Sequence, residues 1–178
     1  CAGVPNGSSV DLGCGCGNPA KIPGYYCDGT EYPNIGDIFA GGMVFQINED
    51  GSGLVADLQD LLHYQWQGGP SSTVMSWWEA HDAAQNSTAQ GYDDWYLPSV
   101  TSSQYNASTS DVGEFELMYN TIGPGGPEGN IGGFSLDAPP GLEQYPVAYG
   151  AYWAADNNLA VNNQSADIFN FVSGNSSW

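Results

Sequence analysis

The sequence has almost no positive charge. Lysine and arginine together occur once, as Lys21, whereas aspartate and glutamate occur 20 times, which gives a formal net charge of −19 at pH 7. Nucleic acids and anionic membranes are excluded as natural partners, because a surface of this charge repels polyanions. Because Lys and Arg side chains are so scarce, a carboxylate that is not solvated must accept hydrogen bonds from backbone N–H groups, carry a proton or bind a cation. Calcium is the cation expected for such an oxygen-rich site, and a solvated acidic surface is the alternative.

Long hydrophobic runs and familiar catalytic motifs are also missing. No run of 18 apolar residues is present, so no membrane span is expected. The start has neither the basic end nor the apolar stretch of a signal peptide, and we expect any such signal to have been removed or to lie outside these residues. Only His63 and His81 occur as histidines, and the motifs of zinc hydrolases, G-x-S-x-G hydrolases and phosphate-binding loops are absent. We therefore expect no enzymatic activity, with a hydrolase that uses Asp or Glu as the minority alternative.

Cysteine is absent after residue 27. The preceding segment is rich in Gly, Pro and Ser and contains all four cysteines, namely Cys1, Cys14, Cys16 and Cys27. We predict that residues 1–30 form a tail stapled by two disulfides, because this segment cannot bury enough apolar surface to fold alone, and that residues 31–178 form the main domain. Since Cys14 and Cys16 are too close for an easy mutual bond, Cys1 pairs with one of them and Cys27 with the other, and both connectivities stay open. A zinc site built from the four cysteines and a lipidated Cys1 are the alternatives.

Acceptor sequons for N-linked glycans are more frequent than the composition predicts. Five are present, and they begin at Asn6, Asn86, Asn106, Asn163 and Asn175. Together with the expected disulfides they indicate a protein from the outside of a cell, a secreted and glycosylated one.

The hydrophobic pattern predicts an α+β protein with an antiparallel sheet and two helices. The runs at 43–48 and 53–58 flank a turn with the Asp-Gly step of a hairpin. Helices are expected at about 73–86, with Ser71 or Ser72 as the cap, and at 112–123, with Asp111 as the cap. Two late strands, at 149–156 and 166–173, lie on either side of an Asn-rich turn. The order of hairpin, helices and late strands excludes βαβ repetition.

Candidate binding residues are aromatic or acidic. We expect the four tryptophans inside the predicted elements to lie mostly in the core, namely Trp77, Trp78, Trp95 and Trp153. Trp66, Tyr145 and Trp178 are expected in loops or at the end of the sequence, where a binding or interface role is at least as plausible as a structural one. Candidate ligands for calcium are Asp93, Asp94 and Asp156.

The order of several segments resembles a known family. The segments are "IGDIFAGGMVFQINEDGSGLVADL", "WWEAHDAAQ", "GYDDWYLPS", "ELMYNTIGP", "GGF", "YWAAD" and "ADIFNFVSG", which cover residues 35–174. This order is similar to that of the C-terminal domains of bacterial collagen-like adhesins, the Lcl C-terminal domain, which is similar to C-type-lectin-like folds; the resemblance thus implies a C-type-lectin-like domain. The N-terminal "CAGVPNGSSVD" and "CGCG" resemble the short cysteine-bearing repeats of secreted bacterial surface proteins. The resemblance implies an extracellular adhesion or display module without catalysis.

Two departures from that family shape the functional hypothesis. The family often binds polyanionic glycans, a mode that a chain with Lys21 as its single Lys or Arg cannot use. Family members also continue beyond the strand that ends near "FVSG" with a closing strand, whereas "NSSW" follows here, so an open strand edge is expected. If the tail of one subunit docks on the open edge of the next, the contact repeats from copy to copy. We therefore predict a homopolymer, a self-assembling extracellular filament joined head to tail. A monomeric, calcium-assisted adhesin domain that binds a glycan or a protein is the alternative.

Overall fold

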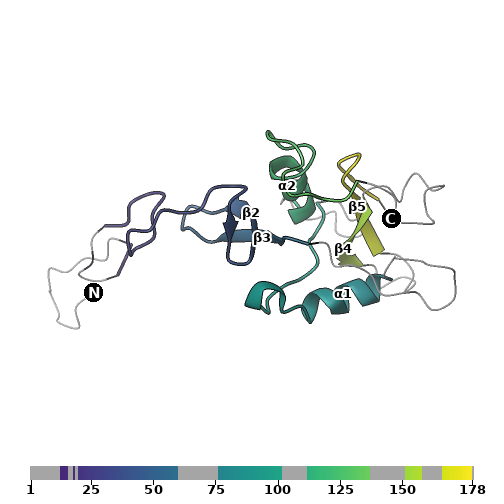
Figure 1. The fold of residues 1–178 in the computed structure, drawn as a ribbon, viewed down its shortest axis with the longest axis horizontal. Helices are drawn as coiled ribbons and strands as arrows, with labels where there is room; N and C mark the ends of the chain where they lie inside the picture. The colour runs from purple at the N-terminus through teal and green to yellow at the C-terminus, as the bar shows by residue number, and fades with distance from the viewer. Residues whose placement is uncertain are drawn as a thin grey trace.

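The computed structural model describes residues 13–15, 18, 20–59, 76–101, 112–136, 151–157 and 166–177 (Figure 1). Within them the protein is α+β, with two three-stranded antiparallel sheets and two α-helices. The α+β class is thus confirmed, although the strands form two sheets and not one. None of the described helices is long and apolar enough to cross a membrane.

The first sheet is the predicted hairpin with a short strand added. Its strands are β1 (Ile38–Phe39), β2 (Gly42–Ile47) and β3 (Gly53–Asp57), in the order β1-β2-β3. The turn is closed by Asp50, whose Oδ1 accepts hydrogen bonds from the backbone N and the Oγ of Ser52 at 3.0 and 2.6 Å. These two bonds also lower the pKa of the Asp50 carboxyl. Gly51 has a φ of +90°, which a residue with a Cβ rarely adopts, so the Asp-Gly step is what this turn requires.

Helix α1 (Trp77–Gln85) begins with a capping box, and a one-turn 3-10 helix at Ala89–Gly91 follows it. Ser76 Oγ accepts from the backbone N of Glu79, while the Glu79 carboxylate accepts from the backbone N of Ser76 at 2.8 Å. The predicted caps Ser71 and Ser72 were therefore wrong, because the Ser-x-x-Glu spacing at 76–79 satisfies two N–H groups reciprocally.

Helix α2 (Glu114–Thr121) is capped by a distant segment. Its N-cap is Gly113, which makes no side-chain capping bond, so the prediction of Asp111 as the cap was wrong. Instead Ser99 caps the helix: its Oγ accepts a hydrogen bond from the backbone N of Glu114, and its carbonyl accepts one from the backbone N of Phe115 at 3.1 Å. The first-turn N–H groups are thus satisfied by a residue 15 positions earlier.

The second sheet has the order β4-β5-β6, with β4 (Ala151–Asn157), β5 (Ala166–Asn170) and β6 (Asn175–Ser177). β6 pairs with β5 from Asn170↔Asn175 to Ile168↔Ser177. The expectation of an open edge after residue 173 was therefore wrong. The turn between the two strands is held by Asn170, whose Oδ1 accepts from the backbone N of Val172 and of Ser173 at 2.9 Å.

A single core cluster joins the two sheets and α2. The buried members come from β2, α2, β4, β5 and the loops between them; they are Phe45, Val100, Phe115, Met118, Ile122, Ala154, Phe169 and Phe171. The rings of Phe115 and Phe169 stack at a centroid distance of 5.4 Å, and those of Phe134 and Phe171 stack at 4.2 Å. Burial of these side chains is the main stabilising term of the fold.

The N-terminal segment lies against the turn of the first hairpin. Tyr26 Oη donates to the carbonyl of Gly51 at 3.0 Å, and Lys21 Nζ donates to the carbonyl of Asp50 at 3.0 Å. The rings of Tyr26 and Tyr32 meet edge to face at 4.6 Å beside the same turn. The N-terminal segment extends the molecule beyond β2 and β3, at the end of its long axis opposite to β4 and β5 (Figure 1).

Candidate functional site

A disulfide staples the N-terminal segment. Cys14 and Cys27 are bonded, with their Cα atoms 5.4 Å apart. This bond belongs to the predicted connectivity in which Cys1 pairs with Cys16, two residues that lie outside the described part of the chain. The alternative of a four-cysteine zinc site was wrong, because two of its thiolates are consumed by the disulfide.

Two of the five predicted glycosylation sites lie in the described structure. Asn86 is exposed at the C-cap of α1, and its Nδ2 donates to the carbonyl of Asp82 at 2.7 Å. Asn175 is exposed in β6, and its Nδ2 donates to the carbonyl of Ser173 at 3.2 Å. The other three acceptors, Asn6, Asn106 and Asn163, lie outside the described residues.

The predicted calcium ligands are not gathered into a site by the described atoms. Asp93 and Asp94 are exposed in the loop that follows the 3-10 helix, and Asp156 belongs to β4, with its side chain outside the described atoms. Among the described residues, no group of three or more His, Cys, Asp or Glu side chains is arranged to hold a metal ion. Calcium binding therefore stays a prediction.

Residues 96–101 connect α2 with the second sheet. The Glu114 carboxylate accepts from Tyr96 Oη at 2.7 Å and from Ser99 N at 2.8 Å, and the carbonyl of Pro98 accepts from Ala155 N at 2.8 Å. Burial raises the pKa of the Tyr96 phenol strongly, and its hydrogen bond to Glu114 acts in the same direction. These hydrogen bonds give the "WYLPS" segment, residues 95–99, a structural role, because they join α2 to the second sheet.

The predicted binding residues Trp66, Tyr145 and Trp178 lie outside the described part of the chain. Of the tryptophans predicted for the core, Trp77 is buried, with 9% of its surface exposed, whereas Trp78 is 50% exposed. The prediction was therefore wrong for Trp78. His81, the histidine in the described structure, stacks on Trp77 at 4.8 Å and lies 3.5 Å from Asp82 Oδ1.

The solvent face of α1 is the aromatic surface that sequence reasoning missed. Trp78, Asp82 and Asn86 are spaced four residues apart and are all exposed. Trp77, Ala80 and Ala84 are buried on the other side of the helix. The signal was present in the sequence, since the four-residue spacing places Trp78 with two polar residues and not with the alanines.

Comparisons of the chain with models of protein families, with curated proteins and with solved structures found no match. The resemblance to the Lcl C-terminal domain, and the C-type-lectin-like fold that it implies, therefore stay predictions carried by the sequence motifs.

Proposed function

We propose that the protein is a secreted, glycosylated and non-enzymatic surface protein, and that its copies join head to tail through the N-terminal segment into an extracellular filament. The observation that carries the proposal is a series of exposed large apolar side chains in the N-terminal segment and in β1, which follows it. Five of them fall between residues 22 and 39, namely Ile22, Tyr25, Ile35, Ile38 and Phe39. Exposed large apolar side chains that come together in a patch are typical of an interface.

The shape of the segment supports a joint between copies. The Cys14–Cys27 disulfide and the contacts of Lys21 and Tyr26 with the hairpin turn fix the segment's course, so little conformational entropy is lost when it binds. It projects at the end of the molecule opposite to β4 and β5 (Figure 1). A surface at one end that binds a different surface at the other end repeats from copy to copy, and it produces a fibre when the rotation between copies does not close a ring.

The receiving surface is assigned to the end that carries the second sheet. With β6 in place on β5, the joint is not the addition of a strand to β5. Val172, in the turn between these strands, is exposed and offers an apolar contact at that end. The charge of −19 opposes association, so salt or a divalent cation promotes it by screening.

Light scattering and electron microscopy of the full chain at rising NaCl or CaCl2 concentration test the proposal. Fibres are expected from the natural sequence and not from the double variant Ile22→Ser, Ile38→Ser. Val112→Ser is the matched control, because Val112 is 55% exposed and Ile38 is 59% exposed, but Val112 precedes α2 and lies outside the segment. If the double variant formed fibres as readily as the control, the contact between copies would not involve this segment and the proposal would be wrong.

A further inference from the structure

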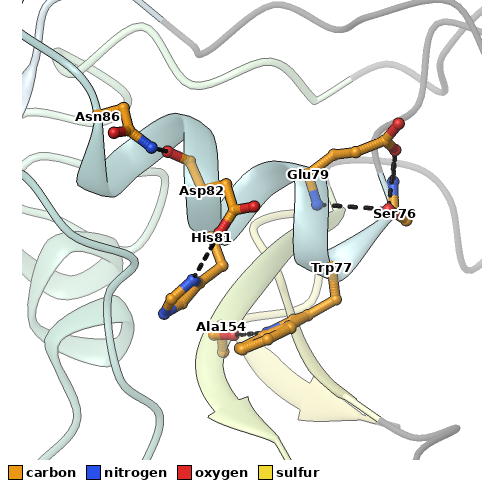
Figure 2. Close-up of polar contacts among 7 residues, drawn as sticks. All are labelled: Ser76, Trp77, Glu79, His81, Asp82, Asn86 and Ala154. Atoms are coloured by element: carbon orange, nitrogen blue, oxygen red, sulfur yellow. Dashed lines mark hydrogen bonds and ion pairs between the residues drawn. The ribbon is translucent and has the colours of Figure 1, made fainter.

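The solvent face of α1 carries Trp78, whose ring is positioned by a contact with the buried Trp77. The rings of Trp78 and Trp77 meet edge to face at a centroid distance of 4.8 Å. Trp77 in turn is fixed, because its Nε1 donates to the carbonyl of Ala154 in β4 at 2.7 Å (Figure 2). The exposed half of Trp78 is therefore a positioned apolar surface, and an indole left in water loses the stabilisation that burial would give it.

The polar residues around Trp78 indicate which partner covers it. The exposed face of the helix also carries Glu79, Asp82 and Gln85, and it has no Lys or Arg. An anionic partner would be repelled from such a face. A neutral saccharide is not repelled, because it carries no charge. Its C–H faces pack on an indole, and its hydroxyl groups form hydrogen bonds with carboxylate and amide groups.

An attachment point for a saccharide lies on the same face. Asn86 begins the sequon Asn86-Ser87-Thr88, and its side chain is exposed at the end of the helix (Figure 2). Eight residues separate it from Trp78, which is about 12 Å along a helix axis, a span that roughly two or three sugar units cover. Asp82 lies between the two positions, and 74% of its side-chain surface is exposed.

The hydrogen bond of Asn86 is compatible with this attachment. Its Nδ2 donates to the carbonyl of Asp82 at 2.7 Å and carries two hydrogens. An N-glycosidic bond replaces one of them and leaves the other to keep this bond. The linkage would then be held against the last turn of α1, so that the glycan starts from a fixed position.

We propose that Asn86 carries an N-linked glycan whose sugars lie along the solvent face of α1 and pack on Trp78. The inference rests on the glycosylated, secreted part of the proposed function and not on filament assembly. In the modification, a glycosyltransferase joins Nδ2 to the anomeric carbon of a lipid-diphosphate-linked sugar. The bond from that carbon to the diphosphate oxygen breaks, the lipid diphosphate leaves with the electron pair, and one amide proton passes to a base of the transferase.

The test uses the full chain from a glycosylating secretory host, in parallel with the same chain from a host without N-glycosylation. Glycopeptide mass spectrometry measures occupancy at Asn86, and hydroxyl-radical footprinting measures the oxidation rate of Trp78. We expect Asn86 to be occupied and Trp78 to be oxidised several-fold more slowly in the glycosylated protein. Exposed Tyr25, which belongs to the N-terminal segment and not to α1, serves as the internal reference in the same digest.

Two variants separate a local effect from a general one. Thr88→Ala removes the sequon and keeps Asn86, so the oxidation rate of Trp78 should rise to that of the protein without sugar. Ser177→Ala removes the Asn175 sequon and should leave Trp78 protected. An unmodified Asn86 beside other occupied sequons would overturn the inference, as would equal oxidation of Trp78 with and without the sugar. Neither result bears on fibre formation, which is measured separately.

Discussion

At the scale of single residues, the two tryptophans that begin α1 differ in what their indoles contact. Trp77 is buried and donates a hydrogen bond to the carbonyl of Ala154, which ties the helix to β4. Half of the Trp78 surface is exposed to solvent, and its ring meets that of Trp77 edge to face. Stability should therefore depend on the first and binding on the second.

Replacing Trp77 by Phe should lower the free energy of unfolding by about 1–3 kcal/mol, because the buried carbonyl of Ala154 loses its donor. Trp78→Phe is the matched control and should change it by no more than about 0.5 kcal/mol. Urea unfolding of the non-glycosylated protein measures both. Equal losses in the two variants would contradict the assigned roles.

The capping box gives α1 a pH dependence of its own. Hydrogen bonds from the backbone and the hydroxyl of Ser76 hold the pKa of the Glu79 carboxyl below its ordinary value of 4.5. A group whose pKa is lowered by folding stabilises the protein above its unfolded pKa, and this contribution is lost as the pH falls through its folded pKa. The natural protein should thus be more stable than Glu79→Gln at pH 7, and this advantage should disappear on acidification to well below pH 4.5. Urea unfolding at both pH values decides, and an advantage of the same size at both would refute the assignment.

At the scale of elements, connections between distant segments determine where several elements begin and end. Residues 96–101 provide the acceptors for the start of α2 and also bond to β4 through Pro98. The turn after β5 places Gly174 against the ring of Tyr119, the residue of α2 that also lies close to Gly125. Helix α2 therefore contacts the turn that starts β6.

Gly174→Ala tests the contact between α2 and this turn. Gly174 has a φ of +70°, and an added Cβ would lie 2.7 Å from the Tyr119 ring. Gly129→Ala is a matched control, since Gly129 has a φ of +74° with open space around the added Cβ. The control should cost about 1–2 kcal/mol from backbone strain, and Gly174→Ala about 1–3 kcal/mol more from the steric overlap. Equal losses in thermal or urea unfolding would show that Tyr119 does not constrain the turn.

Local chemistry explains what the sequence could predict at this scale. The hairpin at β2 and β3 was predicted, because Asp50-Gly51 specifies a turn by itself. The start of α2 could not be, since its capping groups come from Ser99. Strand β6 was missed because Asn-Ser-Ser has none of the β-branched or aromatic residues that mark a strand, and its pairing depends on the turn held by Asn170. Trp78 was predicted for the core with the alanines of its helix, whereas Trp77 is the tryptophan that lies on the buried side with Ala80 and Ala84.

At the scale of the whole molecule, the net charge and the exposed apolar side chains would act in opposite directions on the proposed assembly. The acidic surface keeps copies apart, whereas the exposed apolar residues between 22 and 39 favour contact. Screening by salt shifts this balance toward contact, so assembly should be steeply dependent on ionic strength.

The proposed filament is tested most directly by electron microscopy of the purified full chain at high concentration with calcium and salt present. The account predicts unbranched fibres whose axial repeat is one subunit joined head to tail, and it predicts their loss in the Ile22→Ser, Ile38→Ser variant. A monodisperse monomer under the same conditions would contradict it and would favour the monomeric adhesin domain.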